Sequence, residues 1–109
     1  AYANSKLANV LFTYALAEKL KGTGVTANCL HPGVIATKLL RAGWGLSGSD
    51  AYAGATTSVF LATSPKVAAV SGRYFEDSRE RGSSRASHDK ALQAQLWRVS
   101  ERLTGLGEP

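Results

Sequence analysis

The sequence predicts a mixed α/β protein in which helices cover a parallel sheet. Three features lead to this expectation: apolar residues spaced at three and four near the start, a short β-forming run after them, and a second such run further along. A helix between the two runs makes their connection a right-handed crossover, which joins parallel strands. Two parallel strands do not make a stable sheet, so we expect the missing strands in an N-terminal half that precedes residue 1.

The elements are expected in the order helix 3–20, strand 25–31, lid 37–48, helix 51–63, strand 72–76 and a last helix that starts near 87–89 and stops at 105. Gly22 and Gly24 end the first helix. Ser49 or Asp50 caps the second helix, which ends where Ser64 precedes a proline.

The last helix is expected to bury one apolar stripe, spaced at four, three and four residues. This stripe consists of Leu92, Leu96, Val99 and Leu103. The polar stretch 77–87 before it mixes arginines with acidic residues and serines, so we expect a surface loop there.

Composition limits the classes of function. Thirteen basic against eight acidic residues give a net charge of +5, which favours nucleic acid, anionic lipid or an anionic cofactor, or is simply a solvated basic surface. Cys29 is the single cysteine, which excludes an internal disulfide and a metal cluster built on thiols. A lone cysteine is typical of a reducing compartment such as the cytoplasm, and no apolar run reaches the roughly 18 residues of a membrane span.

The first helical turn places Tyr2 and Lys6 four residues apart, with Ser5 between them. Side chains at this spacing project from one helix face, with Cβ atoms roughly 5 to 6 Å apart. A cation this close favours the phenolate, which lets a phenol exchange a proton near neutral pH, as alcohol oxidation or carbonyl reduction requires. Chance would produce this spacing in roughly one such chain in five, so the pair alone is a weak motif.

A turn after the first predicted strand is a second indication of a functional site. It reads Pro32, Gly33, Val34 and continues to Thr37. Open α/β sheets bind ligands at the carboxyl ends of parallel strands, where a glycine lets the backbone come close. Val34 offers a free N–H and Thr37 a hydroxyl. A Pro-Gly turn without any ligand is the alternative for this dipeptide by itself.

The stretch 37–48 is too apolar for a solvent loop and too rich in glycine for a firm helix. We interpret it as a mobile lid over an apolar substrate. Its apolar side chains are Leu39, Leu40, Trp44 and Leu46.

Four segments, in this order, resemble the C-terminal part of a short-chain dehydrogenase/reductase, and within that family the retinol dehydrogenase group. They are YANSK at 2–6, HPGVIATKL at 31–39, SGRYFEDS at 71–78 and LWRVSERLTGL at 96–106. The resemblance implies the C-terminal portion of a Rossmann-like, doubly wound parallel sheet. It also implies an oxidoreductase that transfers a hydride between NAD or NADP and an alcohol or carbonyl, here an apolar one such as a retinoid, steroid or lipid.

The resemblance also implies roles for individual residues. Tyr2 stands at the place of the family's catalytic acid/base, and Lys6 at the place of the lysine that supports it and hydrogen-bonds the nicotinamide ribose. Pro32, Gly33 and Val34 stand where the family holds the nicotinamide end of the cofactor. Thr37 falls near the carboxamide or pyrophosphate.

The family's glycine-rich dinucleotide loop, catalytic serine and structural asparagine all belong to its first half. The 109 residues alone are therefore expected to be inactive. Members of the family often pair subunits through the helix that carries this tyrosine, so a homo-oligomer is expected to form through the first helix. NAD versus NADP, the substrate and membrane attachment stay open.

The alternative is a basic interaction module that binds nucleic acid or a protein partner, or an enzyme-derived piece kept for oligomerisation. The arginines of 73–85 are offset by acidic residues and accompanied by no nucleic-acid motif, so no nucleic acid partner is expected. We expect a hydrogen-bonded structural role for His31, a solvated His88, an inert core thiol at Cys29 and a core or interface position for Trp97.

Overall fold

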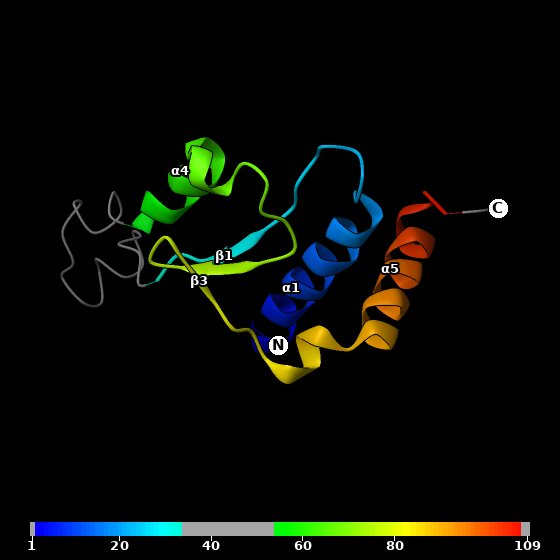
Figure 1. The fold of residues 1–109 in the computed structure, drawn as a ribbon. Helices are drawn as coiled ribbons and strands as arrows, with labels where there is room; N and C mark the ends of the chain where they lie inside the picture. The colour runs from blue at the N-terminus through cyan, green and yellow to red at the C-terminus, as the bar shows by residue number, and fades with distance from the viewer. Residues whose placement is uncertain (1, 34–53, 108–109) are drawn as a thin grey trace.

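The computed structural model describes residues 2–33 and 54–107. Its elements are α1 (Tyr2–Lys19), β1 (Cys29–His31), α4 (Thr56–Thr63), the 3-10 helix η1 (Pro65–Val67), β2 (Tyr74–Glu76), β3 (Arg79–Arg81), the 3-10 helix η2 (Arg85–His88) and α5 (Lys90–Thr104) (Figure 1). The expected positions outside the described residues are Val34, Thr37, the lid 37–48 with Leu39, Leu40, Trp44 and Leu46, and the caps Ser49 and Asp50.

The sheet has the strand order β1-β2-β3. β1 and β2 are parallel, with Leu30 opposite Phe75, and this confirms the predicted parallel pair. β3 runs antiparallel to β2. β1 and β2 are shorter than the runs that predicted them, because only three residues of each are paired.

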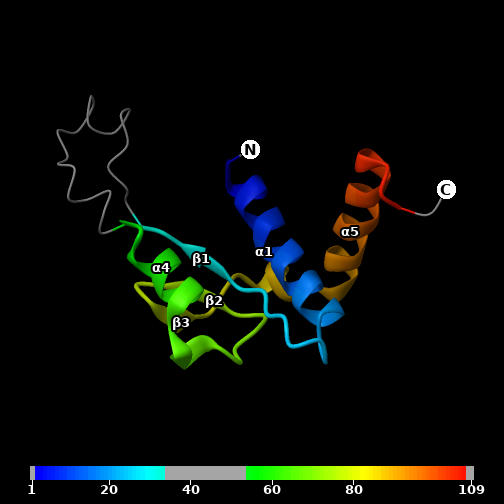
Figure 2. The ribbon, with the colours of Figure 1, turned by 90° about the horizontal axis from the view of Figure 1, so that it is seen from above.

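Helices cover both faces of the sheet. Side chains alternate along a strand, so Leu30 and Phe75 point to one face and Cys29 and Tyr74 to the other. Phe60 of α4 packs on the first face, with its ring centroid 6.4 Å from that of Phe75. α1 lies along the other side of the sheet and separates it from α5 (Figure 2).

The opening helix is confirmed to within one residue at each end. It buries Leu11 and the small side chains of Ala15 and Ala17, which let neighbouring elements approach closely. Gly22 and Gly24 follow it with φ values of 81° and 82°. These left-handed conformations suit glycine and stop the helix, as the sequence predicts.

The bounds of the last helix are also as predicted, but its buried face is not. The Asp89 carboxylate accepts a hydrogen bond from the backbone N–H of Leu92 at 3.1 Å and so caps α5. Gln93, only 5% exposed, is the buried residue of the helix, whereas Leu103 is 80% exposed. The predicted stripe lies about 120° around the helix from the side that faces α1. Two contacts fix this rotation: Gln93 donates to the Ser87 carbonyl at 2.9 Å, and Trp97 stacks on a ring of α1.

The expectation of a plain surface loop at 77–87 is wrong in part, because this stretch contains β3 and η2. Asp77 and Ser78 adopt φ values of 52° and 58°. Positive φ at both central residues is what a two-residue hairpin turn of type I′ requires, and glycine usually supplies it. Thr57 Oγ1 of α4 accepts a hydrogen bond from the Ser78 N–H at 3.0 Å and holds the turn. β3 itself is exposed, so the predicted surface position is confirmed.

Candidate active site

A hollow of about 730 Å³ opens between the first half of α1, the end of β1 and the segment that joins β3 to α5. Its lining brings together residues that are far apart in the sequence, among them Tyr2, Lys6, Pro32, Gly33, Tyr74 and Ser83. All four predicted site residues that the structure describes therefore line one hollow. Val34, Thr37 and the predicted lid lie outside the described residues.

Tyr2 and Lys6 lie side by side at the start of α1. Lys6 Nζ is 5.3 Å from the centroid of the Tyr2 ring, as the spacing of one helical turn predicts. Tyr2 is 74% exposed, so its phenol is open to a ligand. Ser5 donates from its hydroxyl to the Tyr2 carbonyl at 2.8 Å, which gives this serine a local role within the helix.

The Pro32–Gly33 turn follows directly on β1. Gly33 has a φ of 83°, a left-handed conformation that accounts for glycine at this position. A Cβ built on Gly33 would meet no heavy atom of the described residues within 4 Å. The backbone at this end of the strand is therefore accessible to a flat ligand. His31, just before the turn, is exposed and lies 3.7 Å from the Glu76 carboxylate across the parallel pair, which is longer than the hydrogen bond expected of this residue.

Cys29 of β1 and Tyr74 of β2 line the hollow where it borders the sheet. Burial raises the pKa of the Cys29 thiol and outweighs the opposing effect of the nearby Thr13 hydroxyl. The thiol also contacts the Arg73 carbonyl at 3.8 Å. It is half-buried at a cavity wall rather than in the core, and its protonated form fits the expected inert thiol. Burial, followed by the nearby Glu76 carboxylate, raises the pKa of Tyr74.

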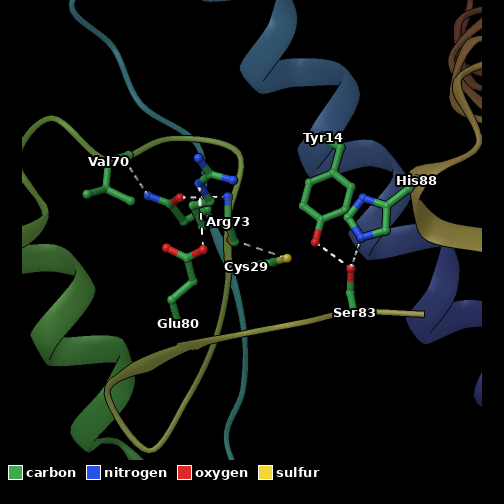
Figure 3. Close-up of polar contacts among 8 residues, drawn as sticks. Tyr14, Cys29, Val70, Arg73, Glu80, Ser83 and His88 are labelled. Carbon is green, nitrogen blue, oxygen red and sulfur yellow. Dashed lines mark hydrogen bonds and ion pairs between the residues drawn. The ribbon is translucent and has the colours of Figure 1, made fainter. Parts of the chain in front are cut away.

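Ser83 and Ser87 of the hollow's lining belong to a cluster that the sequence did not indicate. Figure 3 shows its contacts among Tyr14, Ser83 and His88. Ser83 Oγ lies 2.6 Å from the Tyr14 hydroxyl, 2.7 Å from Ser87 Oγ and 3.2 Å from His88 Nε2. The His88 ring also stacks on Tyr14, with centroids 5.2 Å apart. His88 is exposed, as expected for a solvated histidine, and it makes these two contacts in addition. Tyr14 and Ser83 are 69 residues apart, so no local pattern could have paired them.

The charged side chains of the described surface are mostly exposed and partly paired. Arg73 Nε lies 3.8 Å from Glu80 (Figure 3), and Lys21 lies 2.9 Å from Glu18, whose pKa it lowers through a hydrogen bond and its charge. In residues 2–33 and 54–107 we find no helix that meets the length and hydropathy of a transmembrane span. The same residues hold no group of three or more His, Cys, Asp or Glu side chains placed to share a metal ion.

No protein-family model matches the chain. It is 41% identical over 119 residues to retinol dehydrogenase 14 of Homo sapiens, an alignment that covers 96% of this chain and 35% of that protein. It is 38% identical to retinol dehydrogenase 13 of Homo sapiens, covering 100% of this chain and 38% of the relative. It is also 38% identical to dehydrogenase/reductase SDR family member 13 of Bos taurus, covering 98% and 32%.

The chain thus spans about a third of the length of the curated relatives it matches. None of these proteins carries a name that indicates a nucleic-acid-binding or interaction module, so the alternative raised by the basic charge gains no support. The α/β elements, the parallel strand pair and the similarity over nearly the whole chain agree with one another. The chain is accordingly similar to the retinol dehydrogenase-like members of the short-chain dehydrogenase/reductase family.

Proposed function

We propose that this chain supplies the catalytic tyrosine and lysine of an oxidoreductase that transfers a hydride between NAD or NADP and an alcohol or carbonyl. The observation that supports this most directly is the position of Lys6 Nζ, 5.3 Å from the Tyr2 ring, at a hollow that also takes in Pro32 and Gly33. Names of the relatives point to the same chemistry.

Tyr2 is the proton-transfer residue in this proposal. Its hydroxyl donates a proton to a carbonyl oxygen during reduction, and its phenolate accepts a proton from an alcohol during oxidation. Lys6 supports Tyr2 by its positive charge, which lies 5.3 Å from the ring. A bound nicotinamide cofactor would supply the hydride acceptor for oxidation and the hydride donor for reduction.

Pro32 and Gly33 would hold the nicotinamide end of that cofactor. The open backbone at Gly33 fits the approach of a flat ring. Val34 and Thr37 are the further candidates, through a backbone N–H and a hydroxyl. We assign the pyrophosphate-binding loop to the N-terminal half of the same domain, so that residues 1–109 form the C-terminal part of one Rossmann-like, doubly wound unit.

The substrate is proposed to be apolar. Four apolar side chains in the stretch 37–48 supply the reason, namely Leu39, Leu40, Trp44 and Leu46. According to their names, three of the relatives act on retinol, which is an apolar alcohol. A retinoid, steroid or lipid-like alcohol or aldehyde is therefore the class to test first, against polar carbonyls of matched size.

The test of the proposed function uses the complete protein that carries this chain. Tyr2→Phe keeps the ring but removes the proton, and it should lower turnover by about 100-fold or more, as loss of a general acid/base does. Circular dichroism should show unchanged folding, because Tyr2 is exposed. Near-normal turnover in this variant would rule out Tyr2 as the catalytic acid/base.

A further inference from the structure

The segment between β3 and α5 forms one wall of the hollow, and one side chain holds it to α1. Gly82, Ser83, Ser84 and Ser87 all line the hollow. Ser83 Oγ has three partners, Tyr14 of α1 and Ser87 and His88 of η2. We refer to Tyr14, Ser83, Ser87 and His88 as the hydroxyl cluster.

Counting protons gives the direction of each hydrogen bond in the hydroxyl cluster. Ser87 donates its only proton to the Ser84 carbonyl at 2.5 Å, so its oxygen can only accept from Ser83. Ser83 therefore donates its own proton to Ser87. Tyr14 O–H and His88 Nε2–H must then both donate to Ser83 Oγ.

With these bond directions, every hydrogen-bonding position of the Ser83 hydroxyl is occupied. A serine hydroxyl offers one proton and two acceptor positions, and all three are used. Ser83 therefore cannot form a hydrogen bond with a substrate while these three hydrogen bonds are intact. Ser87, at 1% exposure, is shut off from solvent as well.

The cluster also fixes a distance across the hollow. Tyr14 belongs to the same rigid helix as Lys6, eight residues or roughly 12 Å further along its axis. η2 packs on this helix. A hydrogen bond from Tyr14 to Ser83 therefore sets where the wall at 82–87 stands relative to Tyr2 and Lys6.

We propose that Ser83 is a positioning residue: it ties the segment 82–88 to α1 through the hydroxyl cluster and thereby sets the width of the substrate-binding hollow. This inference rests on the proposed function, because it assigns the hollow to the substrate. Ser83 itself touches neither substrate nor reacting atoms in this role.

Two measurements on the complete protein test the inference. Ser83→Ala should speed amide hydrogen exchange in 82–88 and leave exchange in α4 unchanged. It should also raise KM for an apolar carbonyl roughly fivefold, the effect of losing about one part-buried hydrogen bond, with kcat within about twofold. Ser83→Thr retains the hydroxyl and should restore both values, and Ser58→Ala on the exposed side of α4 is the matched control.

Should Ser83→Ala fail to fold, Tyr14→Phe removes one donor to the same oxygen and carries the same two measurements. Unchanged exchange in 82–88, or faster exchange with unchanged KM in an active enzyme, would overturn the positioning role alone. A wild-type protein without dinucleotide-dependent turnover would overturn the proposed function and the positioning role together.

Discussion

Trp97 of α5 stacks on Phe12 of α1, with ring centroids 5.4 Å apart and planes inclined by 10°. Lys19 Nζ lies 4.7 Å from the centroid of the Trp97 ring. A flat indole between an aromatic ring and a cation gains both stacking and cation–π energy. This contact docks α5 on the helix that carries the candidate catalytic pair.

Trp97→Ala should therefore destabilise the complete protein by about 2 kcal/mol, through lost burial and lost stacking. Urea unfolding followed by circular dichroism measures this change. Leu103→Ala on the same helix is the control. Its side chain is 80% exposed, so we expect a change below about 0.5 kcal/mol. Equal losses in the two variants would contradict the burial pattern described for α5.

Lys6→Met should lower turnover by about 100-fold, because the variant loses the positive charge that lies 5.3 Å from the Tyr2 ring at the hollow. Initial rates at saturating substrate and cofactor would measure the change. Lys21→Met removes a lysine that pairs with Glu18 away from the hollow, and it should leave turnover unchanged.

Ser78→Gly should stabilise the protein by about 0.5 kcal/mol. Glycine removes the strain of a positive φ, and this gain exceeds the extra entropy that glycine has in the unfolded chain. The Ser78 N–H remains available to Thr57. Thermal unfolding would show a higher midpoint. Ser84→Gly, at a φ of −61°, has no such strain to relieve and should give no gain.

Cys29 should react slowly with iodoacetamide in the folded protein. Burial raises the pKa of its thiol, so less thiolate is present at any alkaline pH than in the unfolded chain. Because the folded pKa lies above the unfolded one, the contribution of the Cys29 thiol to the free energy of unfolding is fully present below the unfolded pKa. This contribution is lost as pH rises through the folded pKa. Alkylation rates from pH 7 to 10, with and without urea, give both midpoints. A folded midpoint below the unfolded one would refute this description.

The chain of 109 residues, prepared alone, should associate and bind neither NADH nor NADPH. Within the described residues β1 pairs with β2 only, so its outer edge presents unpaired backbone groups. We also assign the phosphate-binding loop to the N-terminal half of the domain. Size-exclusion chromatography and a fluorescence titration would test both points, and a well-folded monomer that binds dinucleotide would contradict them.

The sequence predicted those elements whose ends are determined by residues within one helical turn. The helix bounds followed from Gly22 and Gly24, and from Asp89 and Gly105, because caps and left-handed glycines act within one turn. The pairing of Tyr2 with Lys6 followed from helical spacing alone.

Other features depended on contacts that no local pattern contains. The apolar stripe with Leu103 pointed to the wrong face of α5, since the choice of face was decided by Phe12, more than 80 residues away. The hairpin at Asp77 was missed because its turn uses no glycine. The hydroxyl cluster joins Tyr14 to Ser83 only in the folded chain.

The two halves of α1 meet different neighbours. Its first turn carries Tyr2 and Lys6 at the hollow, while Phe12 and Lys19 at the other end hold α5. Tyr2 and Phe12 are separated by roughly 15 Å along the helix axis. Selection for packing can therefore act on the docking pair Phe12 and Trp97 without altering Tyr2 and Lys6, the proposed proton-transfer pair at the other end of the helix.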